Sequence, residues 1–288
     1  MARKKSIVLA SLNIAVSPHP PGTYPKFLRT IENIEVPAFG DERAMVVNVR
    51  KRTAIADREI LSGHIFFYTE LQLGGAWFDT IAKKPVDADI IGDIEIPENL
   101  RPNLKSSRFV FDVRTHRMYF ERKNFAGDVF GPKKVKKVLE NLTGTDRVMM
   151  EFPNVSITLI PRHDSISRVL SVPNLKRVVI RVERPNADDI STETARLMQM
   201  LEGMKAKKLE STLVKAAGAQ RLDLNDDFIT MAKVSSENGY THAFGETNAG
   251  MKVERKTSNY PAMHHIEMDE GDDAFGRIFE FLRYEFNE

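Results

Sequence analysis

The sequence predicts an α+β fold of two domains, in which mixed, mainly antiparallel sheets are flanked by helices. Residues 43–52 and 59–71 are rich in β-branched and aromatic side chains, which is typical of strands. Residues 132–142 have the apolar spacing of an amphipathic helix. A chain of 288 residues is long for one small core, so we expect one domain at 1–160 and a second at 161–288.

The first domain is expected to begin with a strand at 6–16 and a short helix at 24–31, before the two β-rich segments. A long loop at 74–105 contains several prolines and acidic residues, and we expect only a short edge strand at 94–96 within it. Its acidic part, residues 85–102, is either a solvated surface or a segment that covers or binds something.

A buried hairpin and a lysine-rich helix are expected next. The strands at 108–113 and 117–122 alternate only weakly between apolar and polar residues, which indicates burial on both faces. The helix begins at Pro132, a residue suited to the first helical position. One buried stripe is predicted, formed by Val135, Val138, Leu139 and Leu142. A strand at 147–160 is expected to follow.

The second domain is expected to mix helices and strands. We predict helices at 165–170, 191–217, 226–236 and from 272 onward, and strands at 175–183, 240–246 and 251–256. Ser191 is the expected N-cap of the longest helix and Gly218 its stop. The last helix carries too many phenylalanines for a free tail, so we expect it to pack on the second domain or across a dimer interface.

The composition bounds the class of protein. Hydrophobic content of 42% and charged content of 28% are typical of a soluble globular chain, and no apolar run approaches the ~18 residues of a membrane span. Cysteine is absent, which excludes disulfides and thiolate metal sites and favours a cytoplasmic location. No phosphate-binding or dinucleotide-binding glycine motif is present. We therefore expect no cofactor and no metal.

The basic residues form three clusters in a chain whose net charge is only +2, so any affinity for nucleic acid must come from local patches. Lys133 and Lys134 lie in the first helical turn, where the helix dipole disfavours cations but a bound phosphate would be stabilised. The candidate nucleic-acid-binding residues are Lys133, Lys134, Lys136, Lys137, Arg50, Lys51, Arg52, Lys205, Lys207 and Lys208. The alternative for each cluster is a solvated face.

An enzymatic alternative is a magnesium-dependent nuclease. Such enzymes often hold the metal with carboxylates and steady the attacking water with a lysine. Glu246, Glu254 and Lys256 lie on two strands of a predicted hairpin and would fit these roles. A similar tripeptide at 121–123 shows that chance also produces the pattern. A third possibility is a protein-interaction module, in which the acidic loop and the C-terminal helix meet a partner.

The middle of the chain resembles RexA, the phage-exclusion protein of lambdoid prophages. The resemblance rests on the hairpin, the Val-Phe-Gly-Pro sequence at 129–132 and the segments at 147–151 and 177–183, which follow in the same order over residues 108–185. The chain is also similar to a bacterial family found near mobile elements and defence genes, for which residues 96–104 are the mark.

RexA-like proteins and the related effector KwaB of the Kiwa system are understood as DNA-binding proteins that act against phage. The resemblance therefore implies a homodimeric, non-enzymatic protein that binds DNA more readily than RNA. It also implies a role in anti-phage defence or phage exclusion, in which a second defence protein would be the partner. The matching position that would carry DNA binding is the helix with Lys133 and Lys137.

Overall fold

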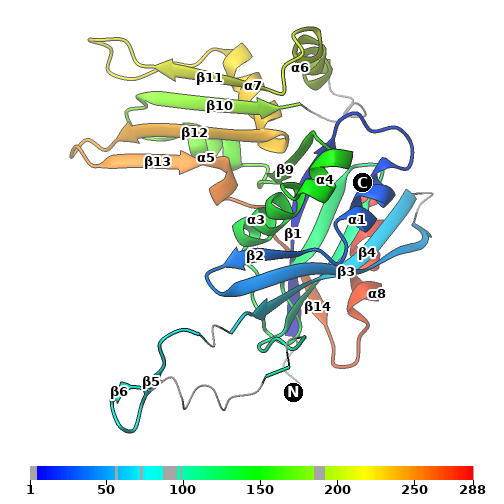
Figure 1. Ribbon diagram of the computed structural model, residues 1–288. Helices are drawn as coiled ribbons and strands as arrows, with labels where there is room; N and C mark the ends of the chain where they lie inside the picture. The colour runs from blue at the N-terminus through cyan, green and yellow to red at the C-terminus, as the bar shows by residue number, and fades with distance from the viewer. Residues whose placement is uncertain are drawn as a thin grey trace.

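A computed structural model describes residues 5–55, 58–71, 74–86, 96–97, 99–184 and 192–287, and it shows the mixed α+β fold with mainly antiparallel sheets (Figure 1). The large sheet has the strand order β14-β1-β8-β7-β4-β3-β2, and β9 also pairs with β1. Its strands are β1 (Lys5–Val16), β2 (Glu35–Phe39), β3 (Glu42–Ile55), β4 (Arg58–Thr69), β7 (Lys105–Asp112), β8 (Arg117–Lys123), β9 (Val155–Leu159) and β14 (His264–Met268).

The large sheet is covered by helices on both faces. Phe109 and Phe111 of β7 pack on one face, in a core shared with α1 (Thr23–Thr30), α3 (Pro132–Thr143) and α4 (Asp146–Glu151). Val110, between them in the sequence, packs on the other face against α8 (Ala274–Asn287). Successive side chains of a strand point to opposite faces, so a sheet buried on both sides is apolar at successive positions. The predicted burial of the hairpin is therefore confirmed.

The lysine-rich helix has the predicted form. Gly131 is the N-cap, Pro132 occupies the first turn, and the predicted stripe of two valines and two leucines is fully buried. The stripe packs toward β2, β9 and β1, so the lysines lie on the other arc of the helix. Helix α3 is therefore held mainly by its apolar side.

The small sheet has the strand order β11-β10-β12-β13. Its strands are β10 (Arg177–Glu183), β11 (Lys208–Val214), β12 (Gly239–Glu246) and β13 (Lys252–Lys256). Helices α5 (Ser165–Leu170) and α7 (Asp226–Glu237) pack on one face, where Val178, Ile180 and Val182 are buried. Figure 1 shows these two helices behind the sheet. The alternate residues of β10 and β12 remain partly exposed on the other face, which we call the open face.

Two predicted elements are wrong. The strand expected at 147–160 is helix α4 in its first part, where Thr145 occupies the N-cap position and Val148 alone of the apolar residues points into the core. Only Val155–Leu159 forms a strand, β9. The helix expected at 191–217 ends as α6 (Thr192–Gly203), and the chain turns at Lys205, whose φ is 53°. The rest of the segment that was expected to be helical includes the edge strand β11. The expected N-cap, Ser191, lies outside the described residues.

The C-terminal helix returns to the large sheet. Strand β14 pairs with β1, and Ile278 and Leu282 of α8 are buried against that sheet. The expectation that this helix packs on the second domain is therefore wrong. Because the chain crosses back, the two sheets do not correspond to two continuous segments of sequence.

The long loop is only partly described. Its described part includes a short hairpin of β5 (Phe78–Asp79) and β6 (Lys84–Pro85), which Figure 1 shows far from the small sheet. The edge strand expected at 94–96 lies mostly outside the described residues, as does most of the acidic stretch. No helix in the described part of the chain is long and apolar enough to cross a membrane.

Candidate nucleic-acid interface

The four lysines of α3 do not act as one group. Lys134 forms an ion pair with Glu42, and its ammonium lies 4.8 Å from the ring centroid of Phe67, so it fastens the helix to the large sheet. Lys136 lies 3.5 Å from Glu140, one turn along the helix. Lys133 and Lys137 are exposed. Lys134 is therefore engaged with the large sheet and Lys136 with its own helix, while Lys133 and Lys137 stay exposed.

Lys133 connects α3 to the small sheet. Its ammonium donates a hydrogen bond of 2.6 Å to the side-chain oxygen of Asn259. Asn259 belongs to the 3-10 helix η1 (Thr257–Asn259), which directly follows Lys256 at the end of β13. The polar side of α3 therefore continues onto the edge of the small sheet, although the two are more than a hundred residues apart in the sequence.

The open face carries a row of aromatic side chains. Tyr240, His242 and Phe244 alternate along β12 with residues that are buried under the helices. Strand pairing places Arg177 beside Phe244 and Arg181 beside Tyr240, both from β10. On the other side, β13 places Lys256 beside His242. The three aromatic rings therefore have two arginines on the β10 side, and Lys256 and Glu254 on the β13 side.

The cations contact the ring faces directly. The Lys256 ammonium lies 3.5 Å from the ring centroid of Tyr240, and the Arg177 guanidinium lies 3.9 Å from that of Phe244. Arg181 is 6.0 Å from the Tyr240 ring. The negative face of an aromatic ring attracts cations at these distances. The rings and the charges therefore form one packed surface.

The electrostatics of Lys256 show that several cations converge. Burial is the largest cause that lowers the pKa of Lys256 below its ordinary value, and the positive charges of Lys136, Lys133 and Arg181 lower it further. A like charge nearby disfavours the charged form of a lysine. We call Lys133, Lys136, Lys256 and Arg181 the basic corner, because they join α3 to the open face.

The acidic residues of the open face are engaged by separate bases. Glu246 pairs with Lys176 at 2.5 Å, and Glu254 lies 3.5 Å from His242. In the residues that the structure describes, no group of three or more histidine and acidic side chains could hold a metal ion. The predicted nuclease set therefore lies on one hairpin, with each carboxylate held by a different partner.

The other two predicted clusters differ in their position relative to the basic corner. Arg52 donates a 2.7 Å hydrogen bond to Ser62 and lies 5.0 Å from the ring centroid of Phe275 in α8. It therefore faces α8, on the side of the large sheet opposite α3; Arg50 and Lys51 precede it on β3. Lys205, Lys207 and Lys208 lie at the turn before β11 and at its first residue. Strand pairing places Lys208 opposite Glu183, two residues along β10 from Arg181, so this cluster borders the basic corner.

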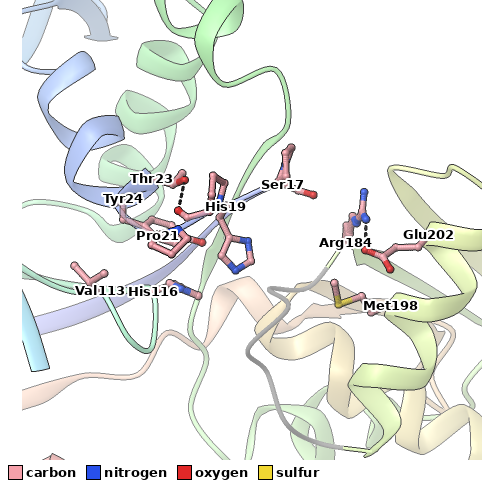
Figure 2. A pocket seen from close by; sticks show the side chains of 13 residues that line it. Ser17, His19, Pro21, Thr23, Tyr24, Val113, His116, Arg184, Met198 and Glu202 are labelled. Carbon is pink, nitrogen blue, oxygen red and sulfur yellow. Dashed lines mark hydrogen bonds and ion pairs between the residues drawn. The ribbon is translucent and has the colours of Figure 1, made fainter.

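A hollow of about 590 Å³ lies between the loop after β1 and helix α6. Figure 2 shows His19 and His116 on one side and Arg184 and Glu202, which form an ion pair, on the other. The Tyr24 ring stacks on that of His116 with centroids 4.2 Å apart. Sequence reasoning did not identify this hollow. Its lining is largely apolar and histidine-rich, so it does not extend the basic corner.

Sequence reasoning also missed the aromatic row. The row is not a linear motif, because it depends on alternation along a strand and on which strands lie beside it. The signal was present as Tyr240, His242 and Phe244 at every second position. The pairing with β10, which adds Arg177 and Arg181, appears only in the folded chain.

The chain belongs to a family described as "Domain of unknown function (DUF4747)", which matches residues 5–282. The match spans both sheets, so the open face and the basic corner lie within the region that defines the family. No curated protein matches the sequence. The resemblance to RexA-like proteins and to KwaB stays a prediction.

Proposed function

We propose that the protein binds nucleic acid without strong sequence preference, through phosphate contacts made by the basic corner. The observation that carries the proposal is the junction of α3 with β13, where Lys133 bonds to Asn259 directly after Lys256. This junction brings Lys133 and Lys136 near enough to Lys256 for their positive charges to lower its pKa. A protein of nearly neutral net charge concentrates cations in this way where it meets a polyanion.

The chemistry of the side chains favours phosphate contacts over base recognition. Lysine carries a compact charge on a flexible stem, so it neutralises phosphates at many positions without reading a base edge. The nearest acid in β10, Glu183, is paired with Arg181 at 2.7 Å and also accepts a hydrogen bond from Ser156. Glu183 therefore moderates the charge of Arg181, as Glu140 moderates that of Lys136, so Lys133 and Lys256 are the main phosphate ligands.

The biological setting that we propose comes from the resemblance to RexA-like proteins. It supports DNA as the ligand before RNA, a homodimer, and a role in anti-phage defence or phage exclusion with a second defence protein as partner. The absence of cysteine supports a reducing cytoplasm as the location.

A salt titration tests the proposal. Lys133→Gln combined with Lys256→Gln removes two phosphate ligands, so the slope of log affinity against log salt on duplex DNA should fall by about 1.8, at about 0.9 for each contact. The loss of affinity should be the same for duplexes of unrelated DNA sequence. The matched control is Lys51→Gln with Lys105→Gln, which removes two charges from the large sheet. If the two double variants weaken binding equally, the basic corner is not the binding surface.

The nuclease alternative receives no support from a specific observation, and we expect no cleavage of DNA or RNA with Mg²⁺ or Mn²⁺. Glu246 and Glu254 each already have a basic partner. The same titration should be repeated with the metal present, with the products separated on a gel. Metal-dependent cleavage that Glu254→Ala abolishes would make the nuclease the better proposal.

A further inference from the structure

We infer that the nucleic acid bound here is single-stranded, and that its unpaired bases stack on Tyr240, His242 and Phe244. This inference rests on the proposed function and adds the form of the ligand. The observations that support it are on the open face, where the aromatic row lies next to the basic corner.

The aromatic row is not part of the core. The core of the small sheet is built on the other face, from residues such as Val178, Ile180 and Ala243. On that face β12 carries small side chains, and a Cβ added at Gly245 would clash with the carbonyl oxygen of Pro173. All the large side chains of this strand therefore lie on the open face, where packing does not require them.

The rings offer two stacking positions. The ring centroids of His242 and Phe244 lie 4.0 Å apart, so these two rings form one position. Tyr240 provides the second, since its Cα lies about 6.8 Å from that of His242 at ~3.4 Å of rise for each residue. Bases that stack at both positions must be farther apart than the ~3.4 Å that separates successive nucleotides of one strand in a duplex. A duplex cannot offer its base faces in this way because they are already stacked and paired.

The cations around the row suit the backbone of such a strand. Arg177 and Arg181 lie on the β10 side of the rings, whereas β13 places Lys256 beside His242 and Glu254 beside Phe244. A backbone that follows the β10 side therefore meets a positive charge at both ends of the row. Arg177 and Lys256 lie against ring faces in the structure described. Cation–π contacts at exposed sites are weaker than base stacking, and a guanidinium plane itself stacks on bases. A base can therefore take the place of either cation or stack upon Arg177.

His242 fits between the other two rings. Its ring centroid lies 4.0 Å from that of Phe244, so the two form a continuous platform. Burial, the largest cause, lowers the pKa of His242, although Glu254 opposes the effect. The imidazole is therefore neutral at pH 7 and stacks without adding a charge.

The test compares two oligonucleotides that differ only in their bases. One is a thymidine strand of about 15 nucleotides, and the other is an abasic strand of the same length with the same number of phosphates. Fluorescence anisotropy at one salt concentration measures both affinities, and a duplex of equal length is the third ligand. The wild-type protein should bind the thymidine strand at least about tenfold more tightly than the abasic strand.

Substitution at the row should abolish this difference. Phe244→Ala should weaken binding of the thymidine strand by about 5- to 140-fold and leave the abasic strand unchanged. Phe244→Leu, which keeps most of the apolar volume, guards against loss of folding and should show the same selective effect. The control is Phe78→Ala, which removes an exposed ring from the β5–β6 hairpin and should change neither affinity.

The outcomes separate this inference from the proposed function. Equal binding of thymidine, abasic and duplex ligands would show that phosphates are bound but bases are not, and would overturn the inference alone. Unchanged thymidine binding by folded Phe244→Ala and Phe244→Leu would do the same. Failure to bind any of the three ligands would overturn the proposed function and the inference together.

Discussion

The two sheets of the protein differ in what covers them. The large sheet has α1, α3 and α4 on one face and α8 on the other, and its strands are apolar on both sides. The small sheet has α5 and α7 on one face, and its strands alternate between buried aliphatic side chains and partly exposed aromatic or basic ones. The difference teaches that burial explains the large sheet, whereas burial does not account for the aromatic and basic side chains of the open face, which we propose contact a ligand.

The charges of the two sheets differ in the same way. In the large sheet, buried Asp112 pairs with Arg58 at 2.9 Å, and buried Glu121 pairs with Arg108 at 3.2 Å. Burial raises the pKa of Glu121, and Arg108 opposes the effect. Buried charges of this kind are tolerated because they are paired. At the basic corner, cations instead accumulate near one another, an arrangement that a bound anion would stabilise.

Of the changes that distinguish the two sheets, deletion of α8 should have the largest effect, on the folding of the large sheet. A chain that ends before Asp272 exposes the face of the large sheet that Ile278 and Leu282 cover. We expect loss of cooperative folding or aggregation, since each fully buried aliphatic side chain contributes roughly 1.5–3 kcal/mol. Circular dichroism and light scattering measure the result. A truncated chain that stays folded, soluble and unchanged in subunit number would contradict the assignment of α8 to the core.

Two phenylalanine substitutions compare the sheets directly. Phe120→Ala in the large sheet should lower the free energy of unfolding by about 3–5 kcal/mol, because the ring is fully buried and leaves a cavity. Phe244→Ala on the open face should lower it by less than about 1.5 kcal/mol, because solvent replaces the ring. Urea denaturation of both variants checks the prediction. Similar losses of unfolding free energy in the two variants would mean that Phe244 contributes to the core as much as Phe120 does.

Acid should destabilise the large sheet through His64. Burial is the first cause that lowers the pKa of His64 from its ordinary 6.5, and the charges of Arg108, Arg52 and Arg50 lower it further. Below pH 6.5 the unfolded chain therefore binds a proton that the folded chain excludes, so stability is lost as the pH falls from 6.5 toward the folded pKa. His64→Gln should reduce the fall in unfolding free energy between pH 7 and pH 5. If the unfolding free energy of the variant falls as much as that of the wild type between pH 7 and pH 5, His64 is not the responsible group.

The smallest expected effect distinguishes neighbouring lysines of α3. Lys133→Glu should raise the free energy of unfolding by at most about 0.3–1 kcal/mol, because an acid at a helix N-terminus is favoured by the dipole while the exposed hydrogen bond to Asn259 is lost. Lys134→Gln should lower stability slightly through loss of its contacts with Glu42 and Phe67, and it should leave the salt dependence of DNA binding unchanged. Thermal melts and the salt titration together test the pair. If Lys134→Gln reduces the slope of log affinity against log salt, Lys134 contacts phosphates and belongs to the binding surface.

Local patterns predicted most elements of the fold. The apolar stripe of α3, the turn between β12 and β13 and the short helix α5 follow directly from residue spacing and turn residues. The failures arose where tertiary context decides. The apolar residues at 147–150 look like a strand, but helix α4 buries Val148 and exposes Met149 and Met150. Likewise, β11 is an edge strand without a fully buried residue, so its pattern carries little information.

The candidate site was only partly predictable for the same reason. The lysines of α3 were identified from their helical arc, but Lys134 binds locally to Glu42, which no spacing rule reveals. Lys256 was considered as a nuclease residue and lies instead beside Lys133 and Lys136. Arg181 and the aromatic row join them through strand pairing between segments about 60 residues apart. Sequence periodicity gives the face of a residue but not its neighbours on the next strand.

Photo-crosslinking tests the central claim most directly. A single strand that carries 5-bromodeoxyuridine would be irradiated with the intact protein, and the linked peptides would be identified by mass spectrometry. The account predicts crosslinks to Tyr240, His242 or Phe244, with loss of the Phe244 crosslink in Phe244→Leu. Crosslinks confined to other regions, such as the face of β3 that carries Arg52 or the β5–β6 hairpin, would contradict it.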